Sequence, residues 1–269
     1  MLQIECSDVA KFYGKTEVFR NLNFRFEGAR CIGIQGPNGS GKSTLLKCLS
    51  GLLRPSKGCI TWRENGEKVD QRMIRFRMGF AAPYLNLYNE LTVTENLSFL
   101  RRIRSSDLAG SRALKSEDSV SVNRAAANSG TSDSASDHFF QSDPIPEIPP
   151  AEQSQNHSGK FQSEVPDLSD LITMCGLTGL HNQSLGTLSS GQQQRVRLAG
   201  ALAFAPPILM LDEPGSNLDD EGHALVADLV TRQKKAGGMI FLASNRKEEL
   251  EICDDMVTLV PKEKTKPRY

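Results

Sequence analysis

No sign of charge predominates in this chain. Its 269 residues carry 32 basic and 32 acidic side chains, for a formal net charge of +0 at pH 7. A balanced charge provides no whole-chain attraction to nucleic acid or to an anionic membrane surface. The length fits one or two domains, and a hydrophobic fraction of 38% is enough for a core.

The chain also lacks clustered cysteines and histidines and has no long apolar run. Six cysteines are scattered without a CxxC pair, and the four histidines lie far apart. These spacings favour reduced, mostly buried thiols in a cytosolic protein over disulfides or a metal cluster. The first nine residues alternate like a strand and do not resemble a signal peptide. Since no apolar stretch approaches the roughly 20 residues that span a bilayer, we expect any membrane role to depend on a partner.

Short apolar stretches alternate between the periods of strands and helices. Residues 30–35 and 207–212 are apolar enough to be buried strands of a parallel sheet. A helix is predicted over residues 43–49, and another begins near residue 91, with Thr92 or Thr94 as its cap. This alternation predicts an α/β fold with a parallel sheet, preceded by a small antiparallel sheet. Further strands are expected at residues 2–13, 18–26, 59–62, 78–81, 239–243 and 256–260, and further helices at residues 168–175, after 191 and at 224–230.

Composition changes abruptly between about residues 105 and 166. This stretch is rich in Ser, Asn, Asp and Pro, has few aliphatic side chains and shows no sustained period. Such a stretch cannot bury enough apolar surface to offset the entropy lost on ordering. We therefore predict a disordered insertion that interrupts one domain, and a basic, frayed tail over residues 262–269.

A glycine-rich segment follows the predicted strand at residues 30–35 and opens a helix. It matches the P-loop pattern, in which backbone N–H groups surround phosphate oxygens at the positive end of a helix. Lys42 is expected to contact the β- and γ-phosphates of ATP, and the Ser43 hydroxyl to bind Mg²⁺. The nucleotide-binding residues predicted here are Gly36, Pro37, Asn38, Gly39, Ser40, Gly41, Lys42, Ser43 and Thr44.

Two acidic residues end the apolar strand predicted at residues 207–212. In P-loop proteins an aspartate in this place, here Asp212, holds Mg²⁺. Glu213, directly after it, is placed to polarise the attacking water as a general base.

The run Leu188-Ser189-Ser190-Gly191-Gln192 opens a further predicted helix about 20 residues before the acidic pair. It has no catalytic carboxylate of its own, so this chain carries one half of each of two ATP contacts. The run resembles the LSGGQ motif of ABC transporter ATP-binding subunits, with Ser190 in place of the first glycine. Together with the P-loop and Asp212-Glu213, this resemblance extends over nearly the whole chain except the insertion.

The resemblance implies a P-loop NTPase fold with a RecA-like parallel sheet, an antiparallel β subdomain and a helical subdomain. A single ABC ATPase domain is expected over residues 1–261, with its core at 1–83 and 186–261 and its helical subdomain at about 84–185. The implied activity is ATP hydrolysis that drives solute transport, with ATP and Mg²⁺ as cofactors. The implied partners are a transmembrane permease and a second copy or a paralogous cassette, which would place the chain on the cytoplasmic face of the cell membrane.

Further family positions can be placed on this sequence. The resemblance implies that Ser189, Gly191 and Gln192 contact the γ-phosphate held by the other subunit, and that Tyr13 stacks on adenine. Residues 216–219 resemble the D-loop at the dimer seam, and residues 91–97 the start of the helical subdomain that contacts the permease. The stretches 90–97 and 217–222 are also similar to ATPase subunits of haem-exporter systems in cytochrome c maturation.

Two positions depart from the family pattern. Pro83, followed by Tyr84, stands where the family usually has a glutamine that touches Mg²⁺ and water. Asn245 stands where the family usually has a histidine that faces the γ-phosphate. An asparagine amide can donate a hydrogen bond to phosphate but cannot carry a positive charge. We therefore expect Asn245 to take part in catalysis with hydrolysis slower than is usual in the family, while binding and dimerisation are kept.

Two other functions stay open on the sequence alone. Soluble ABC-type proteins act on ribosomes or DNA, but they usually join two cassettes or insert long coiled coils. This chain has one P-loop and one LSSGQ run, and its insertion has no heptads and is not strongly basic, so no nucleic-acid partner is expected. A regulatory module that binds ATP but barely hydrolyses it is favoured by Pro83 and Asn245 and opposed by the intact pair Asp212-Glu213.

Overall fold

The computed structural model describes residues 1–85, 87–113 and 164–260. The chain divides into two compact units, one formed by Met1–Arg102 with Asn156–Tyr269 and the other by Ile103–Gln155. Most of the predicted insertion and the whole predicted tail lie outside the described residues. The division into a core and a helical subdomain stays a prediction.

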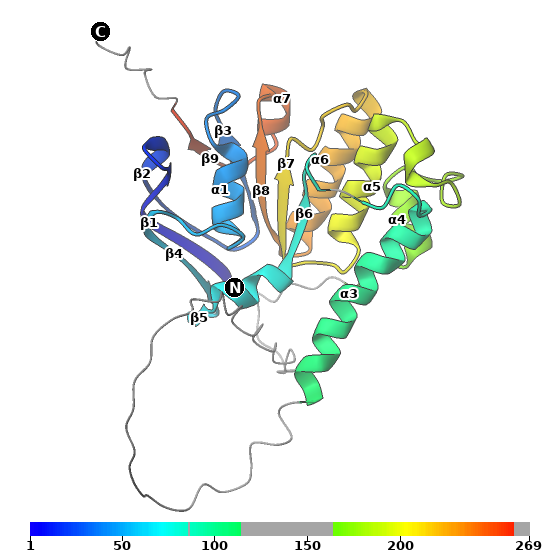
Figure 1. The fold of residues 1–269 in the computed structure, drawn as a ribbon, viewed down its shortest axis with the longest axis horizontal. Coiled ribbons are helices and arrows are strands. Elements are labelled where there is room, and N and C mark those ends of the chain that lie inside the picture. The colour runs from blue at the N-terminus through cyan, green and yellow to red at the C-terminus, as the bar shows by residue number, and fades with distance from the viewer. Residues whose placement is uncertain (86, 114–163, 261–269) are drawn as a thin grey trace, which may run out of the picture. The chain divides into compact units, whose positions relative to one another are not determined.

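The larger sheet is parallel and belongs to the first unit (Figure 1). Its five strands lie in the order β6-β7-β8-β3-β9, and every neighbouring pair is parallel. Asp212 pairs with Ala243, and Gln35 with Ser244, so three strands end at the same edge of the sheet. The predicted α/β fold is therefore confirmed. The bounds are Arg30–Gln35 for β3, Met78–Ala81 for β6, Ile208–Asp212 for β7, Met239–Ser244 for β8 and Asp255–Thr258 for β9.

The smaller sheet has four antiparallel strands in the order β2-β1-β4-β5. Tyr13 pairs with Thr16, so a two-residue turn joins β1 to β2, and Gly14 adopts a φ of 57° in it. A left-handed residue is what a tight hairpin requires, and glycine adopts it without a steric penalty. The bounds are Leu2–Tyr13 for β1, Thr16–Glu27 for β2, Lys57–Glu64 for β4 and Glu67–Val69 for β5, the last of which the sequence did not predict.

Seven α-helices are present among the described residues. The helix α3 continues to Ala113, past the predicted start of the insertion at residue 105. No helix in this part of the chain has the length and apolar character needed to cross a membrane. The bounds are Lys42–Leu49 for α1, Gln71–Ile74 for α2, Val93–Ala113 for α3, Leu168–Met174 for α4, Ser190–Leu202 for α5, Asp220–Lys235 for α6 and Lys247–Leu250 for α7.

Alternate side chains of the parallel strands enter two different hydrophobic cores. Ile208 and Met210 of β7 pack in one core with α1 and the antiparallel sheet. Leu209 and Leu211 of the same strand pack in the other core with α5 and α6. Because successive side chains of a strand point to opposite faces, a strand covered on both sides must be apolar throughout. This explains why β7 is a continuous apolar run.

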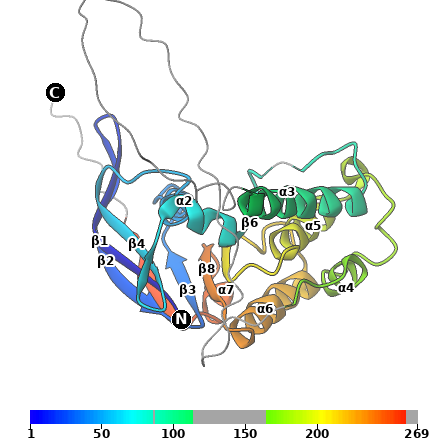
Figure 2. The same ribbon diagram turned by 90° about the horizontal axis from the view of Figure 1, so that it is seen from below.

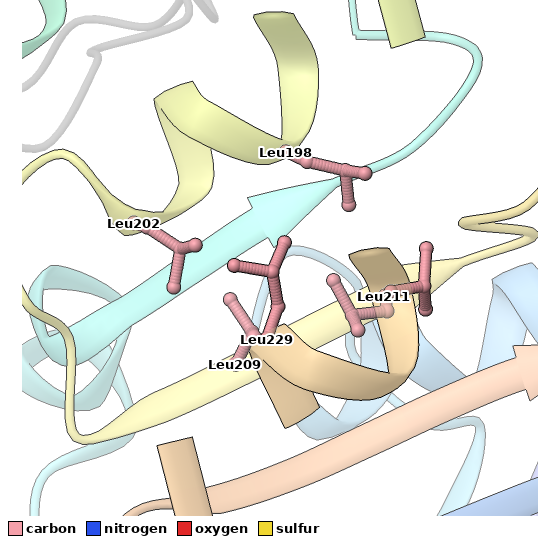
Figure 3. Close-up of a pocket in the computed structure, with 6 residues that line it drawn as sticks. Leu198, Leu202, Leu209, Leu211 and Leu229 are labelled. Carbon is pink, nitrogen blue, oxygen red and sulfur yellow. The ribbon is translucent and has the colours of Figure 1, made fainter. Parts of the chain in front are cut away.

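The core between α5, β7 and α6 is close-packed (Figure 3). Leucines from all three elements point toward one another there, and the space between them holds no volume for a water molecule. This packing fixes α5, the signature-like helix that begins with the LSSGQ run, on the strand that ends in Asp212. The lining residues are Leu198, Leu202, Leu209, Leu211, Val226 and Leu229.

The part of α3 that belongs to the first unit, residues 93–102, lies beside α5 (Figure 2). A Cβ atom at Gly200 would lie 2.7 Å from Cδ1 of Leu100, so glycine permits this close approach. Arg101 Nε also donates a hydrogen bond to the Ala203 carbonyl at 2.8 Å. The start of α3 is therefore held on α5.

The six cysteines are free thiols, and four of them are buried. The burial agrees with the prediction of mostly buried thiols, and their redox state stays a prediction. Burial raises the pKa of the Cys48 thiol to about 11, so that thiol stays protonated and unreactive at neutral pH. Among the described residues no group of three or more His, Cys, Asp or Glu side chains could hold a metal ion.

Thr92 caps α3, as one of the two predicted candidates. Its Oγ1 accepts a hydrogen bond from Glu95 N at 3.2 Å, and Glu95 Oε2 accepts one from Thr92 N at 2.8 Å. We expect Thr92→Ala to lower the free energy of unfolding by about 1 kcal/mol, measured by urea denaturation. Ser98→Ala, in the same helix, should have little effect or a stabilising one.

The cap should also make this loss depend on pH. Hydrogen bonds from Thr92 lower the pKa of Glu95 in the folded chain. The stabilisation is therefore fully present above the ordinary glutamate pKa and is lost as the pH falls through the lowered folded value. An equal cost of Thr92→Ala at neutral and strongly acidic pH would contradict this account of the cap.

Candidate functional site

The predicted P-loop connects the end of β3 to the start of α1 (Figure 1). Gly41 is the N-cap residue of α1 and has a φ of 100°. A Cβ atom there would lie 2.4 Å from Val18 Cγ1, so glycine is required by both backbone and packing. Gly39 also has a positive φ, of 80°, but nothing lies within 4 Å of its notional Cβ. The loop is therefore closed against β2 at one glycine and open at the other.

Lys42 is the centre of the site. Its side chain is only 6% exposed, and its Nζ lies 3.3 Å from Glu213 Oε1. The same ammonium donates hydrogen bonds to the Gly36 carbonyl, at 2.9 Å, and to Asn245 Oδ1. Three segments that are far apart in sequence are thus joined by one buried cation.

Asp212 ends β7 and is 1% exposed. Neither of its carboxylate oxygens has a hydrogen-bond partner of normal geometry in the described structure. Burial raises the pKa of Asp212, while the neighbouring hydroxyls of Ser43 and Tyr84 and the charge of Lys42 act in the opposite direction. A buried carboxylate without a hydrogen-bond donor is costly unless a cation completes it.

These residues fit a hard divalent cation. Two free carboxylate oxygens of Asp212 lie beside the hydroxyl of Ser43. Mg²⁺ prefers oxygen ligands and is commonly held by one carboxylate together with substrate phosphates. That Ser43 and Asp212 hold Mg²⁺ stays a prediction.

Glu213 has a strained backbone. Its φ is 48°, in the left-handed region that few residues other than glycine adopt. Its N–H donates to the Ala243 carbonyl at 2.8 Å, and Oε2 accepts a hydrogen bond from Asn245 N at 3.4 Å. Such strain is concentrated at functional sites, and here it turns the carboxylate toward Lys42.

Asn245 uses both ends of its amide. Its Oδ1 accepts from Lys42, and its Nδ2 donates to Asn38 Oδ1 of the P-loop. The residue therefore links the end of β8 to the P-loop. Its predicted contact with the γ-phosphate stays a prediction.

Tyr84 belongs to the site although sequence analysis assigned it no role. Its hydroxyl lies near Asp212, and its ring stacks under Lys47 Nζ, 3.9 Å from the ring centroid. Burial, followed by the charge of Asp212, raises the pKa of this hydroxyl well above its usual range. The phenol is thus a proton donor beside a carboxylate. The sequence offered one signal for this role. Tyr84 follows the end of β6 by three residues, and β6 pairs with β7, which ends in Asp212.

The LSSGQ run forms a capping box at the start of α5. Ser189 Oγ accepts from Gln192 N at 3.2 Å, and Gln192 Oε1 accepts from Ser189 N at 2.9 Å. The predicted helix start is therefore confirmed. None of the hydrogen bonds or ion pairs found among the described residues joins Ser189, Gly191 or Gln192 to the P-loop, and the predicted contact with a second subunit's ATP stays a prediction.

Tyr13 is 55% exposed at the end of β1. Lys11 Nζ lies 5.3 Å from the centroid of its ring. A core role is excluded by this exposure, and the ring is free to stack on a flat ligand.

An open cavity of about 570 Å³ lies beside the P-loop. It does not include Tyr13 or Asp212 in its lining. The lining combines the start of the P-loop, Asn245 and the segment after β9, in the set Gln35, Gly36, Pro37, Asn38, Asn245, Thr258, Leu259 and Val260.

A family model described as ABC transporter matches residues 19–216. The chain belongs to the ABC transporter family. This match covers most of the chain and confirms the resemblance that the P-loop, the acidic pair and the LSSGQ run carried.

Similar proteins are named as ATP-binding proteins of different transport systems. This ABC transporter protein is 28% identical over 254 residues to the uncharacterized ABC transporter ATP-binding protein YybJ of Bacillus subtilis, covering 93% of this chain and 89% of that protein. It is 27% identical over 257 residues to the Nod factor export ATP-binding protein I of Rhizobium leguminosarum, covering 95% and 66%. The cytochrome c biogenesis ATP-binding export protein CcmA of Rhizobium johnstonii is 28% identical over 237 residues, covering 87% and 83%.

The fold is shared with solved ABC cassettes. The dimeric structure of MJ0796, a bacterial ABC transporter cassette, aligns with a TM-score of 0.64 and 21% identity, covering 96% of this chain and 94% of that one. A structure of the same cassette bound to ADP and Pi aligns equally well, with a TM-score of 0.64. The predicted P-loop NTPase fold is thereby confirmed.

Asn245 generates a direct test of its predicted role. We expect Asn245→His to raise the steady-state ATPase rate, because an imidazolium adds a positive charge beside the transferred phosphate. The matched control is His181→Asn, at an exposed residue outside the site. An Asn245→His protein whose rate does not rise would show that the asparagine does not limit hydrolysis.

Proposed function

We propose that this chain is the ATP-hydrolysing subunit of an ABC transporter, which closes as a pair around two ATP molecules and drives a separate membrane permease. The supporting observation is the gathering of Lys42, Asp212 and Glu213 at one edge of the parallel sheet. No hydrogen bond or ion pair found in the described part of the chain joins the run at 189–192 to these three residues. One chain thus supplies a phosphate-binding and acid–base half-site. A second copy would supply the serine-glycine edge.

The resting ion pair of Lys42 suggests how the nucleotide enters. Phosphate oxygens would replace Glu213 as the partner of Lys42, because they carry more negative charge at the same ammonium. Ser43 and Asp212 would hold Mg²⁺, which when bound supplies charge stabilisation for phosphoryl transfer.

Glu213 would then act as the general base. Released from Lys42, its carboxylate takes a proton from water while the water oxygen bonds to the γ-phosphorus and the bond to the β-phosphate oxygen breaks. Ser189 and Gly191 of the second copy would bind the γ-phosphate from the other side. ATP thereby favours the paired state, and hydrolysis removes that preference.

The proposed cellular place follows from the partner. An ATPase that drives a permease works on the cytoplasmic face of the membrane and is held there by that permease. Relatives named for export and for import match this chain at 25 to 28% identity, so the proposal is confined to the ATPase step and names no cargo.

Glu213→Gln should lower kcat by on the order of 10² to 10⁴, the usual contribution of a general base. The same variant should form a stable dimer in the presence of ATP and Mg²⁺, measured by light scattering after size exclusion. Glu67→Gln, at an exposed carboxylate of β5, is the control and should behave as wild type. A Glu213→Gln protein that stays monomeric at saturating ATP would contradict the two-chain site.

Lys42→Ala should abolish tight ATP binding, because the principal cation of the phosphate site is removed. Isothermal titration with ATP measures the loss. Lys68→Ala, on the exposed β5, should bind ATP as the wild type does. Wild-type affinity in Lys42→Ala would place the nucleotide elsewhere on the chain.

A further inference from the structure

Three polar side chains lie next to one another near the end of β7, namely His223 of α6, Arg246 directly before α7 and Glu249 of α7. Arg246 Nη1 lies 2.8 Å from His223 Nε2. On the other side of the ring, His223 Nδ1 lies 3.2 Å from Glu249 Oε1. The side chain of Glu249 is 6% exposed and the imidazole of His223 is 18% exposed. The carboxylate of Glu249 therefore lies in the protein interior.

The chemistry of the guanidinium assigns the role of one ring nitrogen of His223. A guanidinium can only donate hydrogen bonds, so Nε2 of His223 must be the acceptor. A ring that accepts on Nε2 has its hydrogen on Nδ1, which lies 3.2 Å from Glu249 Oε1. This contact is not a hydrogen bond of normal geometry, and neither buried oxygen of Glu249 has a hydrogen-bond partner among the described residues. A doubly protonated ring would direct N–H toward the N–H of Arg246. The imidazole therefore lies between the guanidinium of Arg246 and the buried carboxylate of Glu249.

The loop after Glu213 rests directly on these side chains. A Cβ atom at Gly215 would lie 2.0 Å from Glu249 Oε1 and 2.5 Å from His223 Nδ1. No larger residue fits there without moving both side chains. Ser216 N donates to the Glu213 carbonyl at 3.1 Å, so the position of this loop is tied to the backbone of Glu213.

The same loop is held by the signature-like helix. Gln194 Nε2 of α5 donates to the Pro214 carbonyl at 3.0 Å. A Cβ atom at Gly191 would lie 2.7 Å from the Asn217 carbonyl oxygen, so the two backbones are in close contact. A displacement of the loop would therefore move the start of α5 and the backbone of Glu213 together.

The other end of this group of side chains adjoins the P-loop. Arg246 directly follows Asn245, whose side chain bonds Lys42 and Asn38 and whose N–H bonds Glu213. The three side chains thus lie between the segment that contacts the P-loop and the loop that contacts α5.

We propose that His223 is a positioning residue for ATP hydrolysis, which holds the loop at residues 214–217 in register with the Asn245-Arg246 segment through Arg246 and Glu249. The inference rests on the proposed ATPase function. His223 does not touch the reacting atoms in this account; it acts through Glu213 and Asn245.

The test compares two substitutions of His223. His223→Phe keeps a ring but removes both nitrogen contacts, whereas His223→Gln offers an oxygen to accept from Arg246 and an N–H to donate to Glu249. We expect His223→Phe to lower kcat about tenfold, the order expected for losing a hydrogen bond to a charged group. KM for ATP should stay within about twofold, since the P-loop is intact. His223→Gln should recover most of kcat, and His181→Phe, at an exposed histidine, should match the wild type.

A spectroscopic readout tests the geometry without activity. Nitrogen-15 NMR of the wild type should show the hydrogen of His223 on Nδ1 with Nε2 as an acceptor, and Arg246→Leu should remove this preference between the two nitrogens. Arg246 is half exposed, so this variant keeps the test available where His223→Phe fails to fold.

Three results would overturn the inference. They are a hydrogen on Nε2 in the wild type, an unchanged kcat in folded His223→Phe, or equal losses in His223→Phe and His223→Gln. Wild-type turnover and ATP-dependent pairing of Glu213→Gln are measured alongside. If these persist while His223→Phe has no effect, the positioning role fails and the ATPase function stands; if they are absent, the function itself fails.

Discussion

A buried cation at the edge of a parallel sheet is the constraint around which the site is arranged. Lys42 is almost removed from solvent, and a lone ammonium in that setting would cost several kcal/mol. Glu213, Asn245 and the Gly36 carbonyl offset this cost. Each comes from a different strand end, so the charge can be compensated only when the strands β3, β7 and β8 stop level with one another.

The compensation is complete for the lysine and incomplete for Asp212. Lys42 has an anion 3.3 Å away. Both oxygens of the neighbouring Asp212 are buried beside the hydroxyls of Ser43 and Tyr84, with no hydrogen bond of normal geometry and no cation at hydrogen-bonding distance among the described residues. A polyphosphate with a divalent cation would change both conditions at once, because the phosphate supplies anions to Lys42 and the metal supplies a cation to Asp212.

Local sequence patterns predicted the parts of the fold that depend on local physics. The bounds of β3 and β6 agree with their apolar runs, and the P-loop lies between strand and helix as its glycines require. The strand β5 was missed because it has only three residues, of which Glu67 and Lys68 are charged, and so gives no pattern. The helix α7 is a single turn and gave no period to detect.

Site residues escaped prediction where their role depends on a distant segment. Tyr84 matters because β6 pairs with β7 and carries its hydroxyl toward Asp212. His223 matters because α6 and α7 bring Arg246 and Glu249 to opposite nitrogens of its ring. A motif describes residues that act through the backbone next to them, so it could find Lys42 and Asp212 but not contacts made across the sheet.

The loop between Glu213 and Asn217 connects the acidic pair Asp212-Glu213 to the LSSGQ helix α5. Its left-handed residues, with φ of 48° at Glu213 and 63° at Asn217, leave little freedom to relax by small torsional changes. In the proposed two-chain site, the partner's nucleotide would press on Ser189 at the start of α5, and α5 is bonded to this loop through Gln194. Because Gly215 packs against the buried carboxylate of Glu249, this loop would shift as a rigid unit. A displacement of α5 would therefore also move the carboxylate of Glu213. A loop without this packing would deform and leave Glu213 in place. The rigidity of the contact at Gly215 therefore affects the position of the proposed general base.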